Sequence, residues 1–115
     1  MGNVNLNKVN LIGNLTADPQ MITLPNGTRM TRFNVALNRR YKTRDGNTKD
    51  SVTFVRVVTY GTNAENCKTY LTKGRKVYIS GRLENNSWVD KETKQRRSIL
   101  QIVGENVQFL GAPPR

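Results

Sequence analysis

With 115 residues, of which 36% are hydrophobic and 23% charged, the chain has the size and composition of one soluble domain, not of two domains or of a disordered polymer. Its net charge of +11 favours a polyanionic partner, such as nucleic acid or an anionic membrane surface. The sequence contains no His and a single Cys, Cys67, which excludes an intramolecular disulfide and a thiolate zinc site. We therefore expect no metal and no cofactor.

The first half of the chain alternates between apolar and polar residues, which is the pattern of half-buried strands. This alternation predicts a strand that begins at Val9, a short strand over residues 21–24 and a long strand over residues 28–41. Residues 42–50 are polar and centred on Asp45-Gly46, which indicates a flexible hairpin loop.

The next strand, expected over residues 52–60, has two chemically different faces. Val55 and Val57 alternate on a face that can point into the core. The opposite face carries the even-numbered residues of this strand, which are Phe54, Arg56, Val58 and Tyr60.

A short helix is expected after this strand, with Asn63 as its N-cap and an end at Lys73-Gly74. Its apolar stripe would consist of Ala64, Cys67 and Leu71, so the thiol is expected to be buried.

The remaining pattern is again that of strands. Alternation from Val77 to Trp88 leads into a turn at residues 90–94, and strands are expected over residues 97–103 and 107–110. Five or six strands, with one helix between the third and fourth long strands, indicate an all-β barrel or sandwich.

Among these architectures, the pattern best matches the OB fold, a five-stranded Greek-key barrel, here with one short α-helix and a long β-hairpin. We expect this domain to cover residues 1–110. Residues 111–115 would be the start of a C-terminal linker or a natural tail.

Four aromatic residues lie among basic ones and are candidates for base stacking: Tyr41, Phe54, Tyr60 and Trp88. A binder of single-stranded nucleic acid needs such platforms along a basic groove, because bases stack on rings and cations neutralise phosphates. Packing in the core is the alternative interpretation for each ring. The other aromatic residues are assigned to the core (Phe33, Phe109) or to packing and interfaces (Tyr70, Tyr78).

Cations accompany these rings in the sequence. Arg56 lies between Phe54 and Tyr60, Lys42 follows Tyr41, and the hairpin that contains Trp88 returns through Arg96 and Arg97. We therefore include these four cations among the nucleic-acid-binding residues.

An ordered set of short motifs runs through nearly the whole chain. In chain order they are Asn7-Lys8-Val9, Gly13-Asn14-Leu15, Asp18-Pro19, Pro25-Asn26-Gly27, Phe33-Asn34-Val35-Ala36, Arg40-Tyr41, Arg56-Val57-Val58, Gly61, Ala64-Glu65, Tyr70-Leu71, Lys73-Gly74, Val77-Tyr78-Ile79, Gly81-Arg82-Leu83, Asn106-Val107 and Phe109-Leu110. Through this set the chain resembles the bacterial and mitochondrial single-stranded DNA-binding proteins, the SSB family.

The resemblance implies an OB fold, a homotetramer and sequence-independent binding of single-stranded DNA in replication, recombination and repair. The family's stacking aromatics fall on the four rings singled out above. It implies further DNA-backbone contacts from Lys8, Arg56 and Lys73. Positions that build the family's subunit interfaces match the first strand, with Val9 and Leu11, and also Tyr78.

Bacterial members of this family usually continue to an acidic tip that recruits replication and repair proteins, whereas this sequence stops at Gly111-Ala112-Pro113-Pro114-Arg115. Those partners are therefore expected only if the native protein has such a tip. The sequence has no apolar run of membrane-spanning length and no signal peptide. We expect no membrane partner and a location in the cytoplasm at the bacterial nucleoid, with the mitochondrial matrix as the alternative.

Two other functions share the same fold: an RNA-binding OB module, and a dimeric, primosome-like protein that acts through protein partners. An enzyme such as a nuclease would need clustered carboxylates for a metal ion. Asp45 and Asp50 lie in the predicted loop, and Asp90 and Glu92 in the predicted turn, where solvation explains them better. We therefore expect no enzymatic activity.

Overall fold

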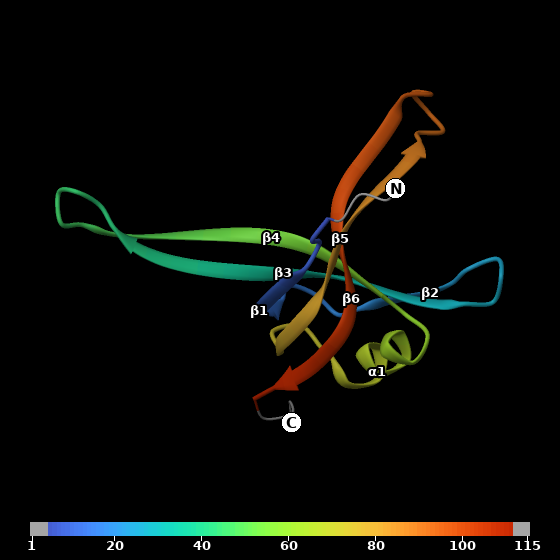
Figure 1. Cartoon of the computed structure of the whole chain (residues 1–115), viewed down its shortest axis with the longest axis horizontal. Coiled ribbons are helices and arrows are strands. Elements are labelled where there is room, and N and C mark those ends of the chain that lie inside the picture. Colours follow the sequence, from blue (N-terminus) through green and yellow to red (C-terminus); the bar gives the residue numbers. More distant parts are fainter. Residues whose placement is uncertain (1–4, 112–115) are drawn as a thin grey trace.

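The computed structural model describes residues 5–111, which form a six-stranded sheet and one helix (Figure 1). In chain order the elements are β1 (Val9–Leu15), β2 (Gln20–Thr23), β3 (Arg29–Lys42), β4 (Thr48–Tyr60), α1 (Thr62–Tyr70), β5 (Lys76–Val89) and β6 (Arg96–Leu110).

Five of the strands close into a barrel in the order β1-β5-β6-β4-β3. Closure comes from β1, which pairs with β5 along most of its length and with β3 at Asn14↔Ala36 and Leu15↔Val35. β2 pairs only with β3 and lies outside the closed ring. The helix connects β4 to β5, the third and fourth strands of the barrel, so the predicted OB fold is confirmed.

Two long hairpins project from the barrel in different directions (Figure 1). β3 and β4 stay paired as far as Lys42↔Thr48, and β5 and β6 as far as Val89↔Arg96. The predicted loop over residues 42–50 is therefore too long, because only residues 43–47 form the turn. A ribbon that is exposed on both faces has no apolar alternation, so its strand residues resemble a loop in sequence.

The core lies inside the barrel and against the helix. Its buried residues are Leu15, Phe33, Val35, Val57, Cys67, Leu71, Val77, Ile79 and Ile102, with Val55 and Phe109 packed against them. The inward orientation predicted for Val55 and Val57 is thus confirmed. Burial also raises the pKa of the Cys67 thiol to about 11.

A β-bulge explains why the last strand looked like two. Ser80 pairs with Asn106 but Gly81 with Gly104, so Glu105 is an extra residue and β6 runs unbroken from Arg96 to Leu110. The extra residue shifts the inward positions from even numbers, such as Ile102, to odd ones, such as Val107 and Phe109, which breaks the alternation. Gly81 permits the close approach, because a Cβ there would lie 1.9 Å from the Val103 carbonyl oxygen.

The helix begins and ends differently from the sequence expectation. Gly61 occupies the N-cap, and Asn63, the predicted cap, donates its side-chain Nδ2 to the carbonyl oxygen of Glu105 at 3.1 Å. The helix ends at Tyr70, before Lys73, although its predicted buried stripe is confirmed. No helix within residues 5–111 is long and apolar enough to cross a membrane.

Candidate nucleic-acid interface

The outward face of β4 carries two exposed aromatic rings with an arginine between them. Phe54 is 65% exposed and Tyr60 36%, and Arg56 lies at the intervening position on the same face. Val58 shares this face, as predicted, but it is only 2% exposed. Its burial places an apolar floor beside the Tyr60 ring.

This floor belongs to a groove that we call the Tyr60 groove. Its lining residues come from four strands and from the connection between β2 and β3: Leu24, Met30, Arg32, Arg56, Val58, Tyr60, Glu84, Asn86 and Gln101. The register brings Met30 opposite Tyr60 and Arg32 opposite Val58, so the outward face of β3 continues that of β4. One ring, two guanidinium groups, one carboxylate and two side-chain amides therefore meet in one concave surface.

A second hollow, mostly apolar, adjoins the first at Arg56. We call it the Phe54 hollow, and it is lined by Val9, Asn10, Leu11, Leu37, Phe54, Val55, Arg56, Leu83, Ile99, Leu100, Gln101 and Ile102. Arg56 also lines a polar hollow with Arg32, Gln20 and Asp18. Arg56 thus lies where three concave surfaces meet. A nucleic-acid strand that passed between the rings of Phe54 and Tyr60 would be within reach of its guanidinium group.

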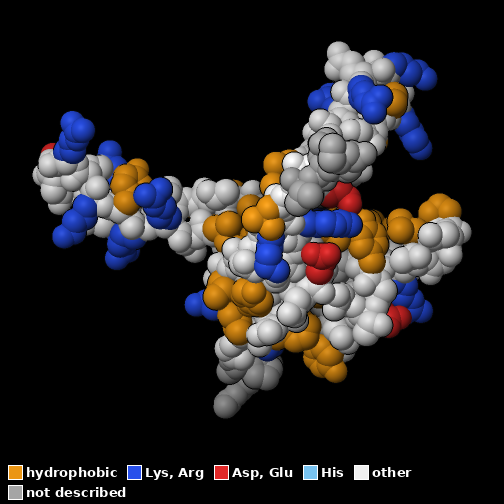
Figure 2. Space-filling model, viewed as in Figure 1, with side chains coloured by type: hydrophobic (Ala, Val, Ile, Leu, Met, Phe, Trp, Pro, Cys, Tyr) orange, Lys and Arg blue, Asp and Glu red, His pale blue; other side chains and the backbone are white. Residues whose placement is uncertain are grey.

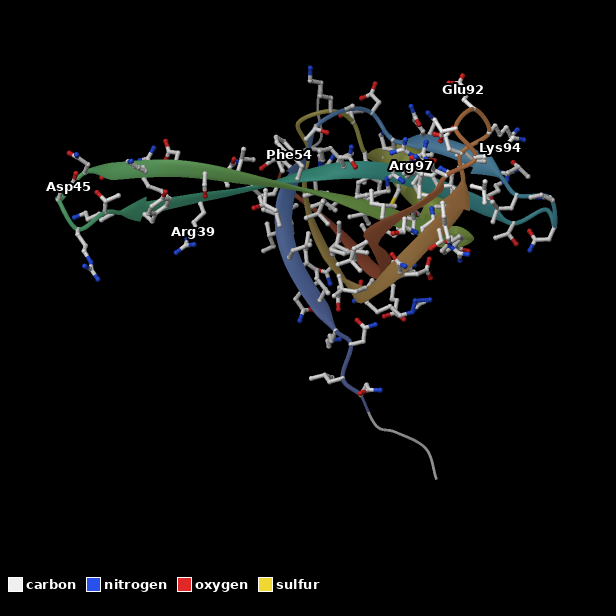
Figure 3. The ribbon with its side chains drawn as sticks, turned by 90° about the horizontal axis from the view of Figure 1, so that it is seen from above. Arg39, Asp45, Phe54, Glu92, Lys94 and Arg97 are labelled. Atoms are coloured by element: carbon white, nitrogen blue, oxygen red, sulfur yellow. The ribbon has the colours of Figure 1, made fainter. Side chains whose placement is uncertain are left out.

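Trp88 extends the same surface onto the β5–β6 hairpin. Glu84, Asn86 and Trp88 alternate on one face of β5, and two of them line the Tyr60 groove. The Trp88 ring is 44% exposed, and its cross-strand partner is Arg97. In Figure 3, Arg97 lies on the same side of the molecule as Phe54.

Tyr41 does not lie on the face that carries Phe54. Its partner in β4 is Lys49, an odd-numbered position, whereas Phe54 pairs with Ala36, so the two rings point from opposite faces of the hairpin. Figure 3 shows Arg39, which shares the face of Tyr41, on the opposite side of the ribbon from Phe54. The Arg39 guanidinium lies 5.4 Å from the centre of the Tyr41 ring. Tyr41 is also five positions beyond Ala36, about 17 Å along the strand.

The other predicted cations are more scattered. Lys8 donates its Nζ to Ser80 Oγ at 3.3 Å, outside the Tyr60 groove. Lys73 is exposed, and its backbone N–H donates to Asp18 Oδ1 at 2.7 Å, beside the polar hollow. Lys42 and Arg96 are exposed near the tips of the two hairpins. None of these placements tests a role in binding, so their roles stay predictions.

The residues predicted for subunit contact separate onto the two faces of the sheet formed by β1 and β5. Val9 and Leu11 pack against the protein's own core. Ile12 faces outward and is 55% exposed, opposite Tyr78. The Tyr78 hydroxyl donates to Asn10 Oδ1 at 3.1 Å, which fixes its ring on this outer surface.

Basic side chains are spread along the β3–β4 hairpin and near the tip of the β5–β6 hairpin (Figure 2). Several carboxylates are paired with cations, such as Asp50 with Arg40 (2.9 Å) and Glu65 with Arg29 (3.0 Å). Within residues 5–111, no three His, Cys, Asp or Glu side chains are grouped so that they could hold a metal ion. Burial, and then the charge of Glu84, raise the pKa of Tyr60, so the phenol is neutral at physiological pH.

The sequence analysis missed Glu84, Asn86 and Gln101 as members of this surface. The signal was present, because Glu84 and Asn86 precede Trp88 at intervals of two. Gln101 could be found only from the pairing of β5 with β6, which places it opposite Glu84.

Comparison with known proteins extends over nearly all of the chain. The profile of the single-strand binding protein family matches residues 6–110. A single-stranded DNA-binding protein of Wolinella succinogenes is 43% identical over 104 residues, which make up 90% of this chain and 64% of that protein. One of Aquifex aeolicus is 42% identical over 108 residues, or 94% of this chain and 72% of that protein. The chain thus spans less than two thirds of the length of the first of these relatives.

Solved structures give the same relationship. The structure of a Plasmodium falciparum SSB complex with ssDNA has a TM-score of 0.83 and 30% identity, and the match covers 96% of this chain and 100% of that one. A deletion mutant of the single-stranded DNA-binding protein from Thermus aquaticus has a TM-score of 0.79 and 32% identity, over 92% of this chain and 51% of that one.

Proposed function

This chain belongs to the single-strand binding protein family, and we propose that it binds single-stranded DNA, without catalysing a reaction, through the Tyr60 groove and the rings beside it. The observation that carries this proposal is the exposure of Phe54, Tyr60 and Trp88 on a surface that also holds Arg32 and Arg56. Rings needed for folding would be buried with the core instead.

Two physical terms account for binding. Each base that stacks on an aromatic ring contributes about 1–3 kcal/mol, and every base has a face that can stack. Each phosphate that an Arg or Lys neutralises releases counterions, which makes the affinity depend on salt. Both terms are largely independent of sequence, which suits a protein that covers any exposed strand in replication, recombination and repair.

We further propose a homotetramer that uses the outer surface of β1 and β5. The exposed Ile12 and the half-buried Tyr78 supply an apolar and aromatic patch there, whereas Val9 and Leu11 would support the strand from inside. Four copies would offer a strand a path around the assembly that a single barrel lacks. Sedimentation should give four times the mass of the chain, and a dimer would favour the primosome-like alternative.

The protein would act where cellular DNA lies, which for bacterial relatives is the nucleoid in the cytoplasm and for mitochondrial ones the matrix. Recruitment of replication and repair proteins is proposed only for a form that carries an acidic C-terminal tip.

Titration with a thymidine oligonucleotide of about 30 nucleotides tests the proposed function. Trp88 is the only Trp, so its emission reports directly on the hairpin that carries it. We expect a saturable decrease in emission, because a stacked base quenches the indole. A uridine RNA of the same length at the same salt is the comparison.

Emission that stays constant while DNA and protein co-sediment would remove Trp88 from the interface. Absence of co-sedimentation would contradict the function itself. Stronger binding of the RNA than of the DNA would favour the RNA-binding alternative.

A further inference from the structure

A carboxylate lies within the surface proposed to bind a polyanion. Glu84 is the only acidic residue that lines the Tyr60 groove, and its side chain is 37% exposed. A carboxylate repels phosphates, so it weakens the part of binding that depends on charge. If Glu84 contacts bound DNA, the contact is therefore with a base and not with the phosphate backbone.

The Glu84 carboxylate is held by its neighbours. Gln101, which is 4% exposed and lies opposite Glu84 in the sheet, donates its Nε2 to Glu84 Oε1 at 3.3 Å. Arg82 Nη2 lies 3.7 Å from Glu84 Oε2. A carboxylate has about four lone-pair positions. The carboxylate is thus oriented by a buried amide and can still accept hydrogen bonds from a ligand in the groove.

Glu84 also lies near the ring on which a base would stack. The Tyr60 ring and Glu84 line the same groove, and the charge of Glu84 contributes to the raised pKa of the Tyr60 phenol. A base that stacks on Tyr60 would therefore direct an edge toward Glu84 and Asn86. In single strands this edge includes the Watson–Crick groups, which are free.

We propose that Glu84 is a specificity-determining residue, which accepts a hydrogen bond from the exocyclic amino group of the base stacked on Tyr60 and so favours cytosine or adenine over thymine there. The chemistry matches, because a Glu carboxylate accepts a hydrogen bond from the N4 amino group of cytosine. The O4 atom of thymine is itself an acceptor, so it would repel the carboxylate. This inference rests on the proposed function and adds a modest base preference to it.

Competition between oligo-dC and oligo-dT of equal length, at one salt concentration and neutral pH, tests the inference. The measured quantity is the ratio of the two affinities in the native protein and in Glu84→Leu. We expect this ratio to shift toward dT by about tenfold in the variant, the size of one hydrogen bond to a charged group. Glu105→Leu is the matched control, because it removes the same charge from the bulge of β6, outside the groove.

A strand of 2-pyrimidinone nucleotides, which is cytosine without its amino group, provides a second measurement on the unmodified protein. It should bind about tenfold more weakly than oligo-dC. This arm decides the question even if Glu84→Leu does not fold.

Equal strengthening of dC and dT binding by Glu84→Leu, or equal binding of the pyrimidinone and cytosine strands, would overturn the inference and leave Glu84 as a source of phosphate repulsion alone. Failure of the native protein to bind either oligonucleotide would instead contradict the proposed function. The two failures are therefore distinguishable.

Discussion

Replacing Phe54 and Tyr60 together by Ala is expected to weaken binding of an oligo-dT strand at least about thirtyfold at fixed salt, since each stacked base contributes about 1–3 kcal/mol. Both rings are exposed, at 65% and 36%, so their loss removes stacking area without opening the core. Fluorescence anisotropy of a labelled strand measures the affinity, and thermal unfolding verifies that the variant is folded.

Tyr70→Ala is the control for the two aromatic substitutions. Tyr70 is 56% exposed but lies at the end of α1, where its ring packs 5.7 Å from that of Phe109. Its removal should leave the affinity unchanged. If the Phe54/Tyr60 variant binds like the native protein, or if Tyr70→Ala is equally impaired, the proposed stacking surface is wrong.

Raising the salt concentration from 50 to 200 mM is expected to weaken binding of the same strand about a hundredfold. The estimate assumes about five neutralised phosphates and a logarithmic slope of about −0.7 for each. The measurement is a series of affinities at four or more salt concentrations.

Arg56 should account for about one of these contacts, because it lies where three concave surfaces meet. Arg56→Gln is expected to reduce the slope by about 0.7. Arg29→Gln is the matched control, since Arg29 pairs with Glu65 of the helix at 3.0 Å. A slope unchanged by Arg56→Gln, or reduced equally by Arg29→Gln, would place the phosphates elsewhere.

The parts of the fold that could be predicted are those in which one face of a strand is buried. Phe33, Val35, Val55 and Val57 alternate against the core, and the sequence shows it directly. The bulge at Glu105 could not be found in this way, because one inserted residue exchanges inward and outward positions. The end of the β3–β4 hairpin was missed for a different reason, since neither of its faces is buried, whereas the turn predicted at residues 90–94 agrees with the end of β5 at Val89 and the start of β6 at Arg96.

The candidate site followed the same rule. The alternation along β4 correctly placed Phe54, Arg56 and Tyr60 on one outward face. Tyr41 has the same parity in β3 as the inward residues Phe33 and Val35, so its position on the face opposite Phe54 follows from the same alternation, which had not been applied to it. Gln101 lies in the groove because it pairs with Glu84. This pairing between distant strands is not specified by any local sequence pattern, so the position of Gln101 could not be predicted.

The most direct measurement compares single-stranded and duplex DNA of equal length and at equal salt. Bases in a duplex are already stacked on one another, so duplex DNA can use only the cations of this protein. We predict that the native protein binds the single strand at least about thirtyfold more tightly than the duplex, which is the loss of affinity expected for the double variant Phe54→Ala/Tyr60→Ala. In that double variant the preference for the single strand should largely disappear. Equal affinity of the native protein for both forms would contradict the account and indicate binding by charge alone.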